Sequence, residues 1–295
     1  MPAVRMHADE VATDETLVRR LLAAQFPHWA GLPIRYVPSY GTDHDVYRLG
    51  EDLVVRLPRI GWAAQQAARE AKWLPWLAPR VPLALPVPLG LGEPAGDYPF
   101  AWSVCTWLPG ENADGTIGDL GRAADDLAGF VRAMRRLDPA LAPDDMRHSR
   151  TGPYSGDAAV RRAIEELGDR IDGPAALRSW DETMAADPHD GPGSWVHGDL
   201  LPGNLLVDGG RITAAIDFGG LSVRDPARDL LAAWSIFTGP SRERYREALG
   251  ADDASWLRGR GWALRQAVNA LPYYWDTNPG MVRMARRELS EVLSG

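Results

Sequence analysis

The sequence predicts an α+β fold with two lobes, a small strand-rich N-terminal lobe and a larger, mostly helical C-terminal lobe. Short runs rich in Val and Tyr are concentrated between residues 34 and 57. After residue 116, apolar residues recur mainly at three- and four-residue steps, as in amphipathic helices. The composition shifts at residues 108–116. We therefore expect lobes at residues 1–108 and 109–295, with a ligand cleft between them.

The N-terminal elements are predicted from apolar patterning and turn residues. An apolar side indicates a helix, runs of Val and Tyr indicate strands, and clusters of Pro and Gly indicate irregular chain. Pro75 is expected to interrupt its helix, because proline lacks the amide hydrogen that a helix interior uses. The expected elements are a helix at 14–26, strands at 34–40, 45–49 and 53–57, a helix from 62 to Pro75, extended, irregular chain at 81–96 and a buried strand at 98–108.

The C-terminal part is predicted to be helical except for short strands that carry polar motifs. Two of these strands, at 205–207 and 212–216, are expected to form a hairpin through Asp208-Gly209-Gly210. Apolar residues at helical spacing indicate the remaining elements. The expected helices cover residues 116–137, 160–171, 226–237, 255–270 and 281–293.

Composition argues against several classes of function. The formal charge is −8, whereas a nucleic-acid-binding protein needs a basic face. This charge suits cationic or neutral small ligands and is also an ordinary solubility charge. Cys105 is the only cysteine, so no internal disulfide can form and a reducing compartment is expected. The sequence shows no membrane-span or secretory pattern, so we expect a cytoplasmic protein without a membrane partner; its oligomeric state is not predicted.

The segment SWVHGDLLPGNLLV, residues 194–207, places Asp199 and Asn204 on either side of a Pro-Gly turn. Asp217 follows the predicted hairpin, which returns the chain to its origin, so the three side chains are expected to converge. Carboxylate and amide oxygens suit Mg²⁺, and a further carboxylate off the metal can accept a proton from an attacking hydroxyl. Protein kinases use Asp-x-x-x-x-Asn and Asp-Phe-Gly for phosphoryl transfer, and both patterns occur here.

These motifs closely resemble those of the aminoglycoside and macrolide phosphotransferases, antibiotic kinases with a bilobal, protein-kinase-like fold. The resemblance rests on VHGDLLPGNLLVDGGRITAAIDFGGLSVRDPARDL and extends to YGTDHDVYRLGEDLVVRLPR, REAKWLPWLA and WLPGE, roughly residues 39–230. It implies that Asp199 is the catalytic base and that Asn204 and Asp217 are Mg²⁺ ligands. We therefore expect ATP or GTP as phosphoryl donor and a hydroxyl group of a small-molecule antibiotic as acceptor.

Other polar residues near the motif have structural interpretations. His197 is interpreted as a histidine that bonds the backbone of the loop, with a proton relay as the alternative. A zinc site of His189, His197 and Asp199 is disfavoured, because the chain has no paired cysteines and zinc would not need the Asn motif. Asp225 and Asp229 are expected to brace the loop or to cap the helix that follows.

The N-terminal lobe is expected to hold the nucleotide. The loop that should cover the phosphates is poor in glycine and retains Gly41. Arg56 occupies the position where a kinase carries its phosphate-binding lysine, and arginine can bind phosphate bidentately. Glu70 is the expected ion-pair partner of Arg56. The only lysine, Lys72, points to another face of the same helix and is expected at the surface.

The nucleotide base and the acceptor are less well specified. Backbone groups around Cys105 and Trp107 are expected to bind the base, although Trp107 could instead belong to the core. Acidic stretches suit a polycationic aminoglycoside, whereas aromatic side chains suit a macrolide or nucleoside antibiotic. The C-terminal aromatics fit helix packing as well. Tyr273, Tyr274 and Asp276 are the predicted acceptor contacts.

Two alternative functions remain open from the sequence. The first is a metabolic kinase of the same superfamily that acts on choline, homoserine or a sugar. The second is a non-catalytic pseudokinase that only binds a nucleotide or a partner. The complete Asp-Asn-Asp set argues against the second alternative, while the glycine-poor loop and the missing lysine argue for it.

Overall fold

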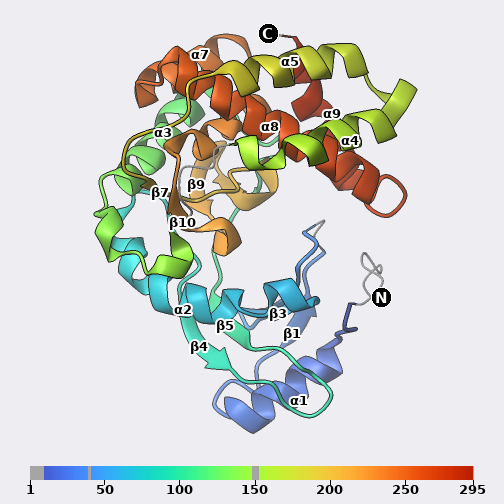
Figure 1. Ribbon diagram of the computed structural model, residues 1–295. Coiled ribbons are helices and arrows are strands. Elements are labelled where there is room, and N and C mark those ends of the chain that lie inside the picture. Colours follow the sequence, from blue (N-terminus) through green and yellow to red (C-terminus); the bar gives the residue numbers. More distant parts are fainter. Residues whose placement is uncertain (1–9, 39–40, 148–152, 295) are drawn as a thin grey trace. The chain divides into compact units, whose positions relative to one another are not determined.

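Figure 1 shows a computed structural model of the chain, which describes residues 10–38, 41–147 and 153–294. The chain divides into two compact units. Unit 1 comprises Met1–Gly110 and Ala214–Gly219, and unit 2 comprises Glu111–Thr213 and Gly220–Gly295. The sequence prediction placed everything after residue 108 in one lobe, whereas residues 214–219 group with unit 1. One reason is that the Ala215 amide donates a hydrogen bond to the Ala84 carbonyl at 3.0 Å.

Unit 1 is built on a five-stranded antiparallel sheet with the strand order β1-β2-β3-β5-β4, coloured blue to green-cyan in Figure 1. Because side chains alternate along a strand, the sheet has two distinct faces. One face packs against helix α1 through Tyr47, Leu49, Val55 and Trp102. The strands are β1 (Ile34–Tyr36), β2 (His44–Leu49), β3 (Leu53–Pro58), β4 (Pro88–Gly92) and β5 (Trp102–Thr106).

Two helices flank this sheet. Helix α1 (Glu15–Gln25) begins after Asp14, whose carboxylate accepts a hydrogen bond from the Leu17 amide at 2.7 Å. Helix α2 (Gln66–Leu77) lies against β4 and β5. The predicted helix at 14–26 and the predicted strands at 45–49 and 53–57 are confirmed to within one or two residues. Of the strand predicted at 34–40, residues 39–40 lie outside the described part.

Two expectations for unit 1 were wrong. Helix α2 continues through Pro75 and ends two residues later, at Leu77. Pro75 removes one amide donor from the helix, and α2 ends soon after it and not at it. The segment at 81–96, expected to be extended but irregular, contains the regular strand β4, which begins at Pro88. This strand is at the edge of the sheet, where a proline without an amide hydrogen is compatible with the ladder.

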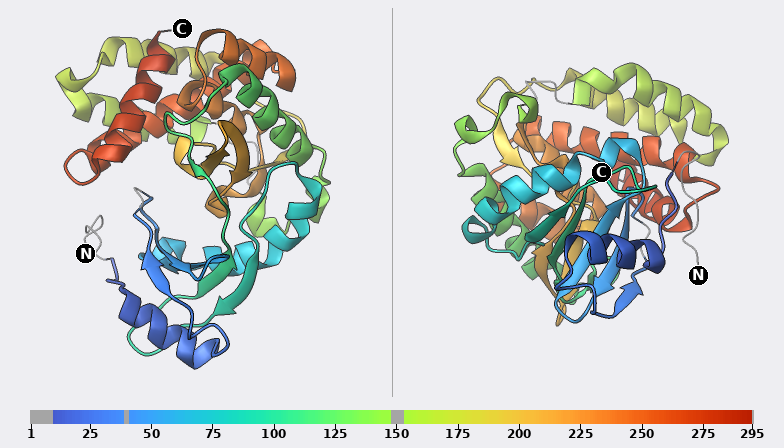
Figure 2. Two further views of the ribbon diagram at one scale, coloured as in Figure 1. Left: turned by 180° about the vertical axis from the view of Figure 1, so that it is seen from behind. Right: turned by 90° about the horizontal axis from the view of Figure 1, so that it is seen from below.

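Unit 2 is mostly helical, and its longest helix, α8, contacts α4, α5, α9 and the 3₁₀ helix η9. Figure 2 shows the yellow-green helices α4 and α5 and the red helix α9 around α8. The sequence prediction did not include α5 and α7 and made α8 too short. The elements are α3 (Leu120–Arg135), α4 (Asp157–Leu167), α5 (Gly173–Ala185), η9 (Pro226–Leu231), α6 (Ala232–Ser235), α7 (Gly239–Leu249), α8 (Asp253–Tyr274) and α9 (Pro279–Leu293).

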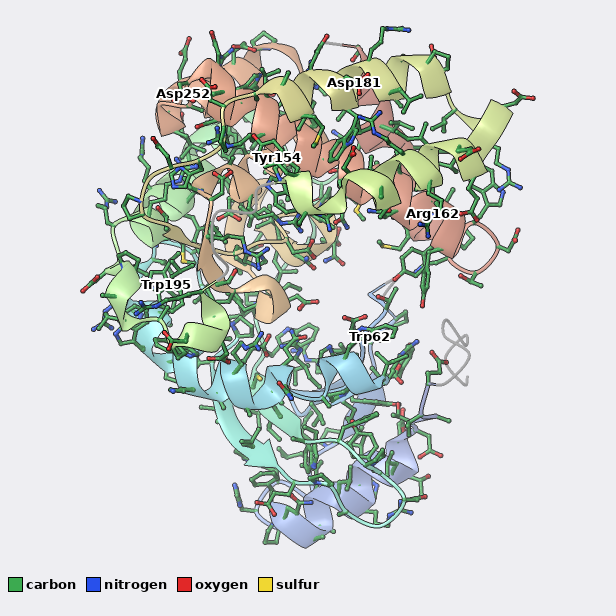
Figure 3. All side chains as sticks on the ribbon, in the orientation of Figure 1. Trp62, Tyr154, Arg162, Asp181, Trp195 and Asp252 are labelled. Atoms are coloured by element: carbon green, nitrogen blue, oxygen red, sulfur yellow. The ribbon has the colours of Figure 1, made fainter. Side chains whose placement is uncertain are left out.

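Helices α4 and α5 run side by side, as Figure 3 shows by the labels Arg162 on α4 and Asp181 on α5. An ion pair joins them, because Arg161 on α4 donates to Asp181 at 2.7 Å. Both side chains are largely exposed, so the pair adds little stability. In the described part of the chain, no helix is both long and apolar enough to cross a membrane.

Short strands in unit 2 frame the motif residues. Strand β7 (Ser194–Val196) pairs with β10 (Ser222–Arg224), and β6 (Glu111–Asn112) pairs with β8 (Leu205–Asp208). The predicted hairpin from β8 to β9 (Arg211–Ala215) is confirmed. Its turn requires glycine, since Gly209 and Gly210 have φ values of 57° and 78°.

Candidate active site

In unit 2, the loop after β7 carries Asp199 and Asn204 side by side. The Asn204 side-chain nitrogen Nδ2 donates to the Asp199 carbonyl at 2.9 Å and to Asp199 Oδ2 at 2.7 Å. The turn predicted from Pro202-Gly203 is a 3₁₀ helix that covers Pro202–Asn204. Because both hydrogen bonds use the amide nitrogen, the Asn204 carbonyl oxygen Oδ1 is the atom that can serve as a ligand.

Asp229 braces this loop from the 3₁₀ helix η9. Its two carboxylate oxygens accept hydrogen bonds from the backbone amides of His197, at 3.0 Å, and Gly198, at 2.8 Å. The His197 side chain is fully buried, and its Nδ1 accepts a hydrogen bond from the Asp199 amide at 3.2 Å. The structural interpretations of His197 and Asp229 are therefore confirmed. Asp225 caps η9, since it accepts a hydrogen bond from the Ala227 amide at 2.9 Å.

Gly198 is required by the backbone of the loop. Its φ value is 84°, a conformation that favours glycine. A Cβ atom at this position would lie 2.5 Å from the Gly220 carbonyl oxygen. The glycine immediately before Asp199 therefore allows the loop to pass close to the neighbouring backbone.

Arg228 was not identified from the sequence and contacts the same loop. Its Nε donates to the Gly198 carbonyl at 2.6 Å, and one terminal nitrogen lies 3.9 Å from Asp199 Oδ1. The guanidinium also stacks over the Trp262 ring, 4.6 Å from its centroid. Burial lowers the pKa of Arg228, and the nearby Asp199 and Asp229 partly offset this effect. No local pattern indicates these contacts, because η9, the loop and α8 are far apart in sequence.

Glu288 on helix α9 is a second residue that the sequence analysis missed. Its side chain is buried, and among the described residues neither carboxyl oxygen has a hydrogen-bond partner. Burial raises its pKa well above the ordinary value, and the negative charge of Asp199 raises it further. The available signal was helical spacing, since Glu288 falls on the buried side of α9 with Ala285 and Leu289.

In unit 1, Arg56, Glu70 and Asp217 form a second cluster, joined by Gln66. Arg56 and Glu70 form a buried ion pair, as predicted from the sequence. The Gln66 side-chain amide donates to Glu70 Oε1 at 2.8 Å and to Asp217 Oδ1 at 2.7 Å. Arg56 lies 3.8 Å from the same Asp217 oxygen. Gln66 was missed, although it lies four residues before Glu70 and therefore on the same helix face.

Electrostatics favours a charged guanidinium in this cluster. Burial opposes the charge on Arg56, but the neighbouring carboxylates of Glu70 and Asp217 outweigh burial and raise its pKa. Arg56 therefore stays charged in the folded protein, and its phosphate-binding role stays a prediction.

Asp217 adopts an unusual backbone conformation, with φ of 60°, the only positive φ of a non-glycine residue in the described part of the chain. The residues around it hold this conformation. The Phe218 amide donates to Glu70 Oε1 at 3.1 Å, and the Phe218 side chain is fully buried. A Cβ atom on Gly219 would lie 2.8 Å from the Gln66 side-chain oxygen, so a larger residue there would displace Gln66. Strain held in this way is common at functional sites.

The remaining predicted nucleotide residues lie in unit 1. Cys105 is buried on β5, and burial raises the pKa of its thiol to about 11. The Trp107 amide donates to the Asp52 carbonyl at 2.7 Å, and Arg48 stacks over the Trp107 ring at 4.5 Å. Gly41 is exposed. These geometries leave the predicted roles of Gly41, Cys105 and Trp107 in nucleotide binding as predictions.

The structure places Lys72 and the predicted acceptor contacts as follows. Lys72 is exposed, as expected. Tyr273 and Tyr274 are at the end of α8, with ring centroids 4.7 Å apart, and Tyr273 is 52% exposed. Asp276 lies in the turn that follows. Acceptor binding by these three residues stays a prediction.

The structure brings together Asp199 and Asn204 in unit 2, and Arg56, Glu70 and Asp217 in unit 1. Asn204 offers a carboxamide oxygen, and Asp217 offers a carboxylate whose side chain is 37% exposed. Both are hard oxygen donors of the kind that Mg²⁺ binds, so each fits the predicted ligand role within its own unit. Within residues 10–38, 41–147 and 153–294, no group of three His, Cys, Asp or Glu side chains could hold a metal ion.

Comparison with known proteins gives a family match and several structural matches. A family model described as a phosphotransferase enzyme family matches residues 37–264. Among curated proteins, no sequence matches the chain.

The structural matches cover nearly the whole chain. The GDP and kanamycin complex of APH(2")-IIia matches with a TM-score of 0.75 and 18% identity, covering 95% of this chain and 99% of that chain. Macrolide 2'-phosphotransferase type I matches with a TM-score of 0.65 and 20% identity, covering 95% of this chain and 98% of that chain. The macrolide 2'-phosphotransferase MphH from Brachybacterium faecium matches with a TM-score of 0.61 and 23% identity, covering 94% of this chain and 97% of that chain. At these identities the matches show the fold, and they confirm the expected kinase-like class and the resemblance seen in the motifs.

Proposed function

The chain belongs to the phosphotransferase enzyme family, and we propose that it transfers the γ-phosphoryl group of ATP or GTP to a hydroxyl group of a small-molecule antibiotic. The observation that carries the proposal is that the Asn204 side chain donates hydrogen bonds to both the backbone carbonyl and the carboxylate of Asp199. It gives the loop a fixed carboxylate of the kind that orients an acceptor hydroxyl in kinase chemistry.

In the proposed reaction, the Asp199 carboxylate accepts the proton of the acceptor hydroxyl. The hydroxyl oxygen forms a bond to the γ-phosphorus, and the bond from that phosphorus to the β,γ-bridging oxygen breaks, so the nucleoside diphosphate leaves. Asp199 Oδ2 is held by Asn204, and Arg228 lies 3.9 Å from Oδ1. Arg228 and Asp199 attract each other electrostatically, so Arg228 helps to position this carboxylate.

The proposed roles in unit 1 concern the donor. Arg56 clamps phosphate oxygens, and Glu70 and Gln66 hold Arg56 and Asp217 in place. Asn204 and Asp217 are the proposed Mg²⁺ ligands. When bound, Mg²⁺ neutralises charge on the phosphate oxygens of the donor.

The choice of donor and acceptor is supported by what similar structures contain. One match is a GDP and kanamycin complex, and another is a ternary complex with streptomycin and ATP. Two further matches are macrolide 2'-phosphotransferases. These proteins share the fold of this chain and act on antibiotics, so an antibiotic hydroxyl is the acceptor that we propose.

The test is a phosphate-transfer screen with purified protein and Mg²⁺. Aminoglycosides, macrolides and nucleoside antibiotics are offered beside choline, homoserine and sugars, with ATP and GTP in parallel. We expect transfer to at least one antibiotic and loss of that transfer in Asp199→Asn. Transfer to a metabolite alone would replace the antibiotic by a metabolic acceptor. Nucleotide binding without transfer to any acceptor would favour a non-catalytic role.

A further inference from the structure

His44 shares a face of the unit 1 sheet with Arg56. Strand β2 pairs with β3 so that His44 lies opposite Pro58 and Val46 lies opposite Arg56. Because alternate residues point to the same side, the His44 and Arg56 side chains are on one face. The other face is packed against α1 through Tyr47. His44 is therefore on the side of the sheet that carries the proposed phosphate clamp.

The His44 residue is largely buried, and its imidazole makes no hydrogen bond within the described part of the chain. The residue is 8% exposed. The ring nitrogens are not among the fully enclosed polar atoms that lack a partner in the described residues, so they keep access to a ligand. This side chain is therefore placed to gain a partner from a bound ligand.

The charges around His44 indicate the chemistry of that ligand. The charged groups that act on His44 are Arg56, Asp217 and Arg59. Burial, and then the positive charge of Arg56, lower the pKa of His44 to about 3. The ring is thus neutral near pH 7 and offers one N–H donor. On this face of the sheet, the charged guanidinium of Arg56 therefore lies beside an N–H donor, a combination that can bind an anion, whereas Arg59 is paired with Asp45 on the other face.

We propose that His44 is a phosphate-binding residue whose ring N–H donates to a non-bridging phosphate oxygen of the nucleoside triphosphate, beside Arg56. This inference rests on the proposed function and extends its donor side. The loop before β2 is poor in glycine, and the chain has no lysine at the kinase position. In kinases, a glycine-rich loop and a lysine donate hydrogen bonds to the phosphates. Here a histidine donor next to an arginine would supply such hydrogen bonds.

The test compares binding of a nucleoside triphosphate with binding of the corresponding nucleoside, by calorimetry on the full chain. His44→Phe keeps a ring of similar size and removes the donor. We expect it to weaken triphosphate binding about 10- to 100-fold, the range for a hydrogen bond to a charged group. Nucleoside binding should be unchanged, and His44→Gln, which keeps an N–H donor, should recover part of the loss. The matched control is His28→Phe, because His28 is an exposed histidine of the same unit.

A measurement on the unaltered protein keeps the inference testable if His44→Phe does not fold. The ring nitrogens of His44 are followed by nitrogen NMR, assigned with the His44→Gln spectrum, while inorganic tripolyphosphate, triphosphate nucleotide or nucleoside is added. The two phosphate compounds should shift the His44 signals, and the nucleoside should not. Unshifted signals on a protein that binds the triphosphate, or equal triphosphate affinity in a folded His44→Phe, would overturn the inference and leave the proposed function intact. Failure of the unaltered protein to bind any triphosphate would instead refute the proposed function.

Discussion

Asn204 holds Asp199 at two points, donating to its backbone carbonyl at 2.9 Å and to its carboxylate at 2.7 Å. One side chain thus fixes both the turn of the loop and the direction of the carboxylate. The second anchor is Asp229, which binds the amides of His197 and Gly198. The proposed base is therefore preorganised by hydrogen bonds, as efficient proton transfer requires.

Asp199→Asn tests the proposed base. The carboxamide has nearly the same shape but cannot accept the acceptor proton, so turnover should fall about 10²- to 10⁴-fold. Nucleotide affinity, measured by calorimetry, should stay close to that of the unaltered protein. Turnover that does not change would exclude Asp199 as the base.

Gln66→Leu tests the bridge between Glu70 and Asp217. The substitution removes hydrogen bonds of 2.8 Å and 2.7 Å to the two carboxylates, so Asp217 should be less well positioned. Hydrogen bonds to charged groups contribute about 1.5–3 kcal/mol each. We therefore expect the Mg²⁺ concentration that gives half-maximal triphosphate binding to rise at least about 10-fold. The matched control is Gln65→Leu, an adjacent exposed glutamine. An equal effect in both variants would contradict the role of Gln66.

Arg56→Met tests the buried ion pair with Glu70. Removing one partner leaves a carboxylate buried without its counter-charge, which should lower the free energy of unfolding by about 3–5 kcal/mol. The double variant Arg56→Met/Glu70→Leu should regain most of that loss in urea unfolding, yet it should not regain triphosphate binding. Arg35→Met, at an exposed arginine on β1, is the control for loss of an arginine. Recovery of nucleotide binding in the double variant would show that Arg56 is not a phosphate clamp.

Glu288→Gln tests the raised pKa of the buried carboxyl on α9. The folded protein keeps this proton to a higher pH than the unfolded chain does, so the folded state binds more protons above the ordinary carboxyl pKa of 4.5. The contribution of Glu288 to stability therefore falls as pH rises from 4.5 toward the raised pKa. Glu288→Gln should remove this slope. The unfolding free energy of the variant minus that of the unaltered protein should therefore increase with pH from 4.5 toward the raised pKa.

The control for this measurement is Glu247→Gln, since Glu247 is an exposed carboxylate on α7 of the same unit. Urea unfolding of the three proteins across the pH range gives the comparison. A Glu288→Gln variant whose unfolding free energy follows the same pH slope as the unaltered protein would mean that Glu288 ionises without penalty in the folded state.

Much of the site could be predicted because its members are close in sequence. Asp199 and Asn204 are five residues apart around a Pro-Gly turn, and the turn alone is enough to bring them together. The β8–β9 hairpin was equally local, because its turn contains Gly209 and Gly210. Arg56 and Glu70 were paired correctly, but this step used the resemblance to kinases and did not follow from spacing alone.

Residues whose role depends on remote contacts were missed. Gln66 gains its importance from Asp217, which is 151 positions away along the chain. Arg228 depends on Trp262 and the Gly198 carbonyl, and Glu288 is affected by Asp199. Pro75 was misjudged for a similar reason, since its effect depended on where α2 ends. Sequence patterns report on neighbours along the chain and contain little information about such pairs.

By itself, the sequence determined the chemistry of the protein: the Asp-Asn pair, the Asp-Phe-Gly tripeptide and the order of strands and helices around them. Only the tertiary structure decided how those groups are held. Packing buries Glu70 against Arg56 and keeps Asp217 in a left-handed conformation. It also leaves the buried Glu288 carboxyl without a hydrogen-bond partner among the described residues. The physical reason is that local geometry follows from nearby residues, whereas burial and electrostatic environment arise when distant segments exclude water together.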